Sequence, residues 1–523
     1  MNNNDKYYLD IGNAKDTLLK GNDKLIYRSL EILPGFLSWG TIILAIIGSK
    51  FWPVATAYFI IIFDFYWFIK AVYLAVHQKV SVRQMKEAME IDWLERLKNL
   101  PESKVSPILK EKNWLNFYHL VILPFANEGW PIVKHTLEVF SQIDYPKEKI
   151  IIALGGEETN KKNAEEIVER AKKEFGNDFF QLITSIHPKG IENELAGKGS
   201  NETWITKQAR GKIKSLNIPE EMIIVSVSDI DTEIYPQYFA CLTYHYLTAK
   251  NPLRSSFQPS PLFNNNIWDA PAISRVASLS SSFWHMIEEE RPEHSATFSS
   301  QAMGLKPLVE MNYWNVKNVS EDSRIFFKAF FYFDGRYQIV PIFYPVSMDA
   351  NLDKTFWRTM KNVYLQQRRW GWGAENIPYV IFASLKNKKI KIRERLRYSF
   401  NQLEGFWSWA TNSIIIFMLG WLPLILGGEK FNQTVLSYNL PRLTRLIMIF
   451  AMIGIISSAY YTVKIIPSRP INRYRKKYLI MILQWLIIPI SLIVFGAIPA
   501  LESQTRLMLG KYMGFWNTPK YRK

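Results

Sequence analysis

Apolar residues along this chain gather in two blocks near its ends. By length, five stretches are predicted to cross a membrane: 33–49 and 51–76 in the first block, then 406–428, 443–466 and 478–501 in the second. About 20 apolar residues span the ~30 Å hydrocarbon core of a bilayer. Lys50 and Pro53 predict a tight turn within the first block, and neither of its stretches combines a basic leader with a small-residue cleavage site. The first block is therefore predicted to be an anchoring hairpin rather than a signal peptide.

Between the blocks, short apolar runs alternate with segments of helical periodicity. Strands are predicted at 118–123, 149–154, 180–186 and 222–227, and helices at 130–143, 164–175 and 356–370. This alternation is typical of a parallel α/β sheet covered by helices on both faces. We expect an N-terminal segment with a membrane hairpin (1–80), a helical linker (81–114), an α/β domain (115–376), amphipathic helices (377–405), C-terminal membrane helices (406–502) and a basic tail (503–523).

The charge pattern favours a membrane over nucleic acid as the partner of the basic residues. The chain has 64 Lys and Arg against 47 Asp and Glu, a net charge of +17. Many basic residues flank the apolar stretches: Lys386, Lys388, Lys389, Lys391, Arg393, Arg395 and Arg397 precede the third, and Arg469, Arg473, Arg475, Lys476 and Lys477 precede the fifth. Basic loops stay on the cytoplasmic side, so the α/β domain between the blocks is expected there, in a multi-pass protein of the cell membrane.

The C-terminal tail conflicts with this topology. Five crossings would leave the tail outside, whereas its basic residues favour the inside: Arg506, Lys511, Lys520, Arg522 and Lys523. One of the assigned spans is therefore open to revision. The single cysteine, Cys241, excludes an intramolecular disulfide and a cysteine-based zinc site. Any metal would be held by oxygen or histidine.

The sharpest chemical feature is Asp229-Ile-Asp231, directly after the predicted strand 222–227. Residues two apart in extended chain face the same side, and open α/β sheets bind ligands at the carboxyl ends of their strands. Two carboxylates there suit Mg²⁺ or Mn²⁺, which would neutralise a nucleotide diphosphate. The alternative is an ordinary turn, because Asp-x-Asp is common in loops.

Two further groups have a functional and a structural interpretation each. Glu321-Asp322 could supply a general base, or could form the first turn of a helix capped by Ser320. In 366–370 (Gln-Gln-Arg-Arg-Trp), helical spacing groups an amide, a guanidinium and an indole, which suit diphosphate and sugar. The alternative for that group is an Arg/Trp cluster resting on lipid headgroups. Asn127-Glu128 and the Lys198 loop are weak signals alone.

Five motifs in order resemble the membrane-embedded family 2 glycosyltransferases, the group that includes cellulose and hyaluronan synthases. They are 124–128 (Pro-Phe-Ala-Asn-Glu), 144–146 (Asp-Tyr-Pro), 229–231 (Asp-Ile-Asp), 321–322 (Glu-Asp) and 366–370 (Gln-Gln-Arg-Arg-Trp). The resemblance covers roughly 117–370 and extends to the flanking spans. It implies a GT-A fold (nucleotide-diphospho-sugar transferase, Rossmann-like) in the cytoplasmic domain. It also implies inverting transfer from a nucleotide sugar, commonly a UDP-sugar, to an acceptor hydroxyl.

The resemblance assigns roles by position. Asp229 and Asp231 would contact nucleotide and metal (Mg²⁺ or Mn²⁺), and Asp322 would be the base, with Glu321 its neighbour. Gln366, Gln367, Arg369 and Trp370 would bind diphosphate and frame the acceptor site, Lys198 would reach the nucleotide, and Asn127 and Glu128 would join the substrate-binding residues. Helices within 377–405 would lie at the membrane interface and cover a translocation channel.

One position departs from the family pattern. Members usually carry an acidic pair such as Val-Asp-Asp after the second strand, where an Asp meets the base, whereas this chain has Gly-Gly before Glu157 and Glu158. Either Glu could replace that Asp. The leading hypothesis is a polysaccharide synthase acting on a glycan or lipid-linked acceptor. The alternatives are a non-processive transferase that uses a lipid carrier, and a catalytically silent membrane scaffold or transport component.

Overall fold

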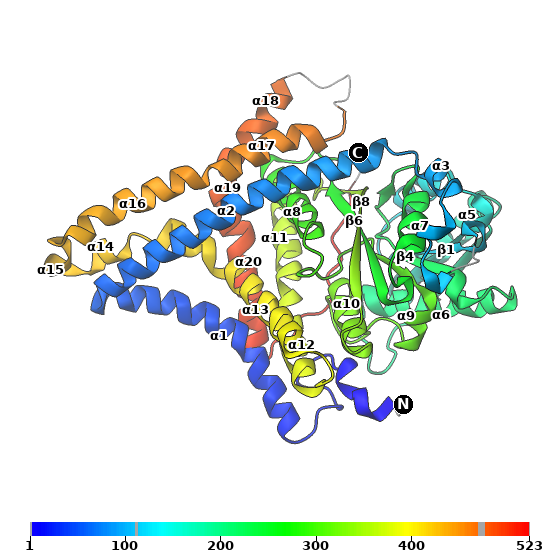
Figure 1. The fold of residues 1–523 in the computed structure, drawn as a ribbon, viewed down its shortest axis with the longest axis horizontal. Coiled ribbons are helices and arrows are strands. Elements are labelled where there is room, and N and C mark those ends of the chain that lie inside the picture. Colours follow the sequence, from blue (N-terminus) through cyan, green and yellow to red (C-terminus); the bar gives the residue numbers. More distant parts are fainter. Residues whose placement is uncertain (1–2, 110–112, 469–475, 522–523) are drawn as a thin grey trace.

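The computed structural model describes residues 3–109, 113–468 and 476–521, and divides into an α/β domain and a bundle of long helices (Figure 1). The predicted α/β domain between two blocks of apolar helices is thereby confirmed. Five residues of the predicted basic segments lie outside the described residues: Arg469, Arg473, Arg475, Arg522 and Lys523.

The domain is built on one eight-stranded sheet of order β3-β2-β1-β4-β7-β6-β8-β5. The strands are β1 Tyr118–Pro124, β2 Ile150–Glu157, β3 Gln181–His187, β4 Ile223–Val227, β5 Glu233–Ile234, β6 Ser255–Phe263, β7 Ala302–Gly304 and β8 Gln338–Met348. Strands β1 to β4 are parallel, as predicted. The prediction of a parallel sheet holds only in part, because β7 runs antiparallel to both β4 and β6, and β5 antiparallel to β8. The sheet is mixed.

Helices cover both faces of the sheet. One face packs against α4 (Trp130–Ser141), α5 (Lys161–Phe175) and α7 (Tyr238–Thr248), and the other against α6 (Lys198–Ser215), α9 (Leu305–Glu310) and α10 (Glu321–Tyr332). Successive residues of β2 enter opposite clusters, Ile150 and Ile152 on the first face, Ile151 and Ala153 on the second. Alternate side chains point to opposite faces, so a strand apolar at every position is one buried on both.

The remaining helices connect the domain to the bundle or lie within the bundle. They are α1 Asn22–Phe51, α2 Pro53–Glu90, α3 Trp93–Lys98, α8 Ala272–Glu289, α11 Phe356–Gly371, α12 Asn376–Lys386, α13 Ile392–Ile414, α14 Leu422–Leu426, α15 Gly428–Asn432, α16 Val435–Ala451, α17 Ile453–Ile465, α18 Lys476–Leu483, α19 Ile488–Leu492 and α20 Ile498–Met508. Within the described residues, four helical stretches are long and apolar enough to cross a membrane: 22–51, 53–90, 435–465 and 478–508.

The prediction of five continuous spans is wrong at 406–428. This stretch is divided: α13 runs into a π turn at Ile415–Leu419, the chain turns at Gly420, and the short α14 follows. Gly lowers helix stability, and Pro423 removes a backbone donor, so a run that is apolar enough by composition is broken by its backbone. Hydropathy alone does not detect such a break.

Candidate functional site

The candidate site lies at the carboxyl end of β4, in the middle of the sheet. Asp229 and Asp231 follow that strand, and the N–H of Thr232 donates to the carbonyl of Asp229 (2.9 Å), which turns the chain there. The Asp231 side chain is fully buried, whereas that of Asp229 is 34% exposed. Both predicted metal-binding acids therefore lie at the edge where the strand-end rule expects them.

Lys198 joins the acids of three separate segments. Its Nζ lies 2.9 Å from Asp229 Oδ1 and 3.0 Å from Asp322 Oδ1, with Glu202 at 3.4 Å and Glu321 at 3.6 Å. Lys198 is the first residue of α6, and Glu321 and Asp322 begin α10, so two helix N-termini meet at the sheet edge. The five side chains form the lysine cluster.

Gly199 makes this meeting of helices possible. A Cβ at Gly199 would lie only 2.9 Å from the Cβ of Glu321, too close for any real side chain. The alternative interpretation is confirmed in part: Ser320 is the N-cap residue of α10, and Glu321 and Asp322 lie in its first turn. The Ser320 side chain, however, makes no cap hydrogen bond, and its backbone N–H donates to Glu375 (2.8 Å). The acids of α10 therefore face the cluster without a side-chain cap.

Burial and neighbouring charges separate the pKa values of the cluster. Burial raises the pKa of Glu202, and burial with the nearby Asp322 raises the pKa of Glu321 to about 8. Burial alone would lower the pKa of Lys198, but the surrounding carboxylates hold it well above its usual value. Burial would raise the pKa of Asp229, yet Lys198 and Lys520 lower it strongly. Glu321 is therefore largely protonated at neutral pH, while Lys198 and Asp229 stay charged.

The cluster also has the composition of a cation site. Among the described residues, one group offers three carboxylate oxygens within 4.8 Å of one another: Glu202, Glu321 and Asp322. Oxygen donors at this density fit a hard divalent cation such as Mg²⁺ or Mn²⁺. The predicted ligands, Asp229 and Asp231, form the other side of the same edge, and Lys198 contacts both Asp229 and Asp322.

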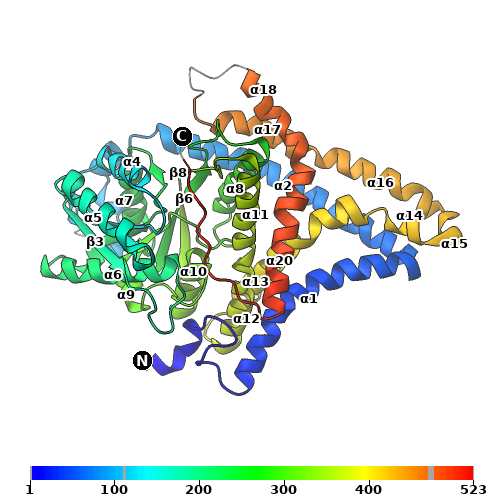
Figure 2. The ribbon, with the colours of Figure 1, turned by 180° about the vertical axis from the view of Figure 1, so that it is seen from behind.

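The C-terminal tail reaches this edge, which the sequence patterns did not indicate. The tail leaves α20 and runs along the α/β domain (Figure 2). Lys520 Nζ lies 2.5 Å from Asp231 Oδ2, and the same oxygen accepts the N–H of Asp349 (3.2 Å). Burial and the neighbouring Asp349 and Asp229 raise the pKa of Asp231 although Lys520 opposes this. The basic character of the tail is the sequence signal that includes Lys520, and it predicts a side of the membrane rather than a contact with Asp231.

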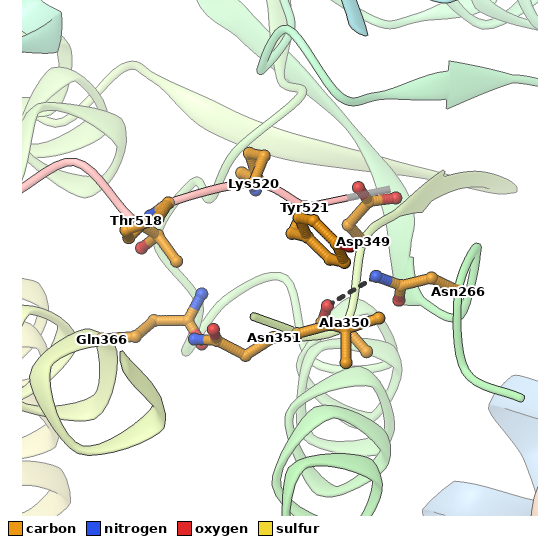
Figure 3. Close-up of a pocket in the computed structure, with 10 residues that line it drawn as sticks. Asn266, Asp349, Ala350, Asn351, Gln366, Thr518, Lys520 and Tyr521 are labelled. Atoms are coloured by element: carbon orange, nitrogen blue, oxygen red, sulfur yellow. Dashed lines mark hydrogen bonds between the residues drawn. The ribbon is translucent and has the colours of Figure 1, made fainter. Parts of the chain in front are cut away.

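The Gln-Gln-Arg-Arg-Trp motif divides its side chains among several surroundings. The Gln366 amide accepts from Asn351 (3.4 Å), Gln367 is buried, and Trp370 packs on the Phe263 ring at 5.6 Å between centroids. Arg369 lies over the Phe515 ring of the tail at 5.0 Å and is close enough to Glu321 to oppose the rise in its pKa. Within the motif, Arg369 thus lies near Glu321 of the lysine cluster, whereas Gln366 contacts Asn351 after the end of β8 (Figure 3).

Four predicted substrate-binding residues make their contacts away from the lysine cluster. The Glu128 carboxylate accepts the N–H of Asn127 (3.0 Å), and Glu158 accepts the N–H of Lys189 (3.1 Å). Glu157 contacts the ring of His187 (3.0 Å). These contacts close local loops at the ends of β1 and β2.

His187 links two loops beside the site. Its Nδ1 contacts Glu157 (3.0 Å) and its Nε2 contacts Glu194 (3.2 Å). Burial alone would lower the pKa of His187, but its hydrogen bonds to the two glutamates raise it. Glu194 belongs to the loop that leads into Lys198, so His187 ties the end of β2 to the start of α6.

Comparison with known proteins gives only distant likenesses. No family model and no curated protein matches the chain. Among solved structures, the mannosyltransferase PcManGT from Pyrobaculum calidifontis, in complex with GDP-Man and Mn²⁺, is 13% identical (76% of this chain, 99% of that one, TM-score 0.38). Residues 1–349 of S. aureus TarS are 12% identical (66% and 92%, TM-score 0.36). GalNAc-T7 with UDP, GalNAc and Mn²⁺ is 10% identical (55% and 57%, TM-score 0.32). Scores this low carry no argument about activity.

Proposed function

We propose that this chain is an integral-membrane glycosyltransferase of the family 2 type, which moves a sugar from a nucleotide sugar to an acceptor hydroxyl. One observation carries the proposal. Asp229 and Asp322, from segments 93 residues apart in the sequence numbering, meet through a single ammonium group at a sheet edge, with Asp231 beside them. Buried carboxylates are unfavourable unless they are paired or used, and clusters of carboxylates with shifted pKa values are typical of functional sites.

Asp322 is the proposed general base. Its side chain is 26% exposed at the start of α10, so an acceptor hydroxyl can reach it, while Glu321 lies buried behind it. As the acceptor oxygen attacks the anomeric carbon, its proton passes to the Asp322 carboxylate and the bond to the diphosphate breaks on the opposite side. The result is inversion at that carbon, and positioned base catalysis typically contributes ~10²–10⁴-fold to such a step.

The charge of the site supports a requirement for a divalent cation. Six carboxylates, those of Glu202, Asp229, Asp231, Glu321, Asp322 and Asp349, stand around two ammonium groups, Lys198 and Lys520. Even with Glu202 and Glu321 protonated, the edge stays negative and would repel a nucleoside diphosphate. Asp229 and Asp231 are the proposed ligands of Mg²⁺ or Mn²⁺, which would neutralise the leaving diphosphate when bound.

The membrane helices extend the proposal to the acceptor. Four apolar stretches of membrane length accompany the site, and α11, which carries the Gln-Gln-Arg-Arg-Trp motif, lies beside α20 (Figure 2). Ser503 of α20 donates to the carbonyl of Arg368 (2.6 Å), which fixes the two helices. A site attached in this way suits a growing glycan or a lipid-linked acceptor delivered at the bilayer, and we propose polysaccharide synthesis and export.

The test uses the full chain purified in detergent. UDP-glucose, UDP-N-acetylglucosamine and GDP-mannose are each supplied with Mn²⁺, Mg²⁺ or a chelator, and release of nucleoside diphosphate is followed. We expect release from at least one donor, its loss with the chelator, and a long product rather than a single addition. Asp231→Asn should weaken metal-dependent donor binding, with Asp178→Asn, on a loop remote from the site, as the matched control. Release that ignores the chelator would overturn the metal assignment.

A further inference from the structure

The turn that follows the Gln-Gln-Arg-Arg-Trp motif carries a buried carboxylate that the proposed reaction does not use. Glu375 is the last residue of the short helical turn Trp372–Glu375, which lies between α11 and α12, and the residue is only 7% exposed. A carboxylate is unfavourable in such surroundings unless hydrogen-bond donors satisfy it. The donors that Glu375 contacts therefore indicate its role.

Three N–H groups from two segments converge on Glu375. Its Oε1 accepts the backbone N–H of Val319 (2.9 Å) and of Ser320 (2.8 Å), and its Oε2 accepts the indole N–H of Trp372 (2.9 Å). Val319 and Ser320 stand directly before α10, in whose first turn Asp322 lies. A charged acceptor makes stronger hydrogen bonds than a neutral one, and negative charge is favourable at a helix N-terminus. Glu375 thus fixes the chain just before the proposed base, and these residues (Glu375, Val319, Ser320 and Trp372) form the Glu375 joint.

Arg324 makes a second connection between the same two segments. It lies on α10, it is fully buried, and its guanidinium donates to the backbone carbonyl of Glu375 (3.0 Å) and to the side-chain oxygen of Asn376 (2.6 Å). The Asn376 amide in turn donates to the hydroxyl of Ser323 (2.8 Å). Hydrogen bonds therefore run in both directions between the start of α10 and the start of α12, which defines the position of one relative to the other.

The Glu375 joint lies between two groups that the proposed reaction must align. Asp322 follows the joint in the first turn of α10, and Arg369 precedes the joint in the last turn of α11. Arg369 is also close enough to Glu321 to oppose the rise in its pKa, so the two helix ends approach each other. A misplacement of about 1 Å, caused by a substitution outside the reacting groups, can lower a rate ~100-fold. The joint therefore controls how the base faces the arginine that holds the diphosphate.

We propose that Glu375 is a positioning residue for sugar transfer, which aligns Asp322 at the start of α10 with Arg369 at the end of α11. This inference rests on the proposed function and adds a residue to the same site. The proposed donor ligands have contacts of their own: Asp229 accepts from the hydroxyl of Ser299 (2.9 Å), and Asp231 accepts the N–H of Asp349 (3.2 Å). Loss of Glu375 should therefore lower turnover and leave donor affinity unchanged.

Glu375→Gln tests the joint with almost no change in size. An amide has one acceptor oxygen, which can still accept from Val319 and Ser320, but its NH2 group then faces the indole N–H of Trp372, and two donors oppose each other. Trp372→Phe removes the indole donor. Because each effect of Glu375→Gln is measured against its own background, the cavity left by the smaller ring cancels in this double-mutant cycle.

The experiment uses the full chain in detergent, with the nucleotide sugar from which it releases nucleoside diphosphate. The kcat for transfer, the affinity for the intact nucleotide sugar from titration calorimetry, and Tm are measured for every variant, with the assays held well below the lowest Tm. Glu169→Gln, exposed on α5 at the opposite face of the sheet, is the matched control. Glu375→Asp keeps the charge and shortens the side chain, and it keeps the test valid should Glu375→Gln fail to fold.

Each outcome has a defined meaning. We expect Glu375→Gln and Glu375→Asp to lower kcat about 100-fold, with a donor affinity equal to that of Glu169→Gln. In the Trp372→Phe background, Glu375→Gln should lower kcat by less than about tenfold. A kcat equal to that of the control, a parallel loss of donor affinity, or equal losses in both backgrounds would overturn the positioning role and leave the proposed function intact. A wild-type chain that releases no diphosphate from any donor would overturn the proposed function and the positioning role with it.

Discussion

Lys198→Gln is the substitution for which the structure most clearly predicts a loss of folding stability. The substitution removes the one cation shared by Asp229, Asp322, Glu202 and Glu321, and leaves a neutral amide of similar length. Lys198 is only 9% exposed, so water cannot replace the lost charge. The prediction concerns folding stability and does not depend on the proposed reaction.

The magnitude follows from the two shortest contacts. At about 3 Å and an effective dielectric constant near 20, each ion pair has a gross attraction of roughly 5–6 kcal/mol, most of which offsets desolvation. Removing one partner of a buried pair typically destabilises by ~3–5 kcal/mol. For a domain of this size, each kcal/mol lowers Tm by about 2–4 °C, so the loss in Lys198→Gln is on the order of 10 °C.

The sign of the pH dependence sharpens this test. Lys198 lowers the pKa of Asp229, and that stabilisation is present at neutral pH and lost only in acid. Without Lys198 the carboxylates of the folded chain bind protons more readily. The loss of folding stability relative to wild type should therefore grow from pH 6 to pH 8. Thermal unfolding in detergent measures it, with Lys212→Gln, exposed on the same helix, as the control. A variant that melts within 2 °C of Lys212→Gln at pH 8 would differ from it in stability by only about 0.5–1 kcal/mol. That result would refute the stabilising role of Lys198 in the lysine cluster.

Three further predictions concern the site and its neighbours. Asp322→Asn should keep nucleotide-sugar binding and lower transfer at least ~100-fold, and full transfer would contradict the assignment of the base. Because His187 has a raised pKa in the fold, its link to Glu157 stabilises below pH ~6.5 and weakens as pH rises through the folded pKa. The Tm of wild type should therefore fall relative to His187→Gln as pH rises, and parallel curves would argue against the link. Lys520→Gln should raise Mn²⁺ affinity several-fold, since it removes a cation beside Asp231, and calorimetry that shows no change would contradict that contact.

Periodicity was enough to predict the strands that carry the site, but not the sheet as a whole. The runs at 118–123 and 222–227 became β1 and β4, because residues apolar at every position can only be buried on both faces. Strand β7, by contrast, has only three residues, Ala302–Gly304, and no hydrophobic pattern can develop over that length. Its reversed direction, which makes the sheet mixed, comes from long-range packing that no local window contains.

The site shows the same division between local and distant signals. Asp229 and Asp231 could be placed because the end of a buried strand is visible in the sequence. Glu202 could not, since a polar residue on a helix is usually solvated, and only its distant neighbours make it buried. The one local sign was Gly199, whose missing side chain lets α6 approach α10. Lys520 depends on the path of the whole tail.

The contacts of the second apolar block account for the broken stretch at 406–428. The contacts of 406–428 and of the preceding turns of α13 show that this segment runs antiparallel to α2. Glu404 contacts Lys70 (2.7 Å), and Gly427, just after α14, lies against Pro53 at the turn between α1 and α2. From there α16 and α17 return beside α2, where Ser457 donates to Gln78 (2.6 Å). The broken stretch therefore reaches the same end of the bundle as α1, although it is not one helix.

The last apolar stretch, 478–508, follows a different path from the other apolar stretches. It begins beside the α/β domain, where Tyr478 packs on Trp268 at 5.2 Å, and it ends beside the first turns of α1, where Arg28 donates to the carbonyl of Met508 (2.5 Å). Between these ends it contacts α13 at two places: Ser413 donates to the carbonyl of Leu492 (3.2 Å), and Gln504 donates to the carbonyl of Phe406 (2.7 Å). Four segments thus reach the far turn, and four passages return the chain to the side of the domain. We propose that these four segments cross the membrane and that 478–508, although long and apolar enough, does not, which leaves the tail on the side of the domain, where Lys520 contacts Asp231. The basic residues before α13 make the cytoplasm our proposal for that side.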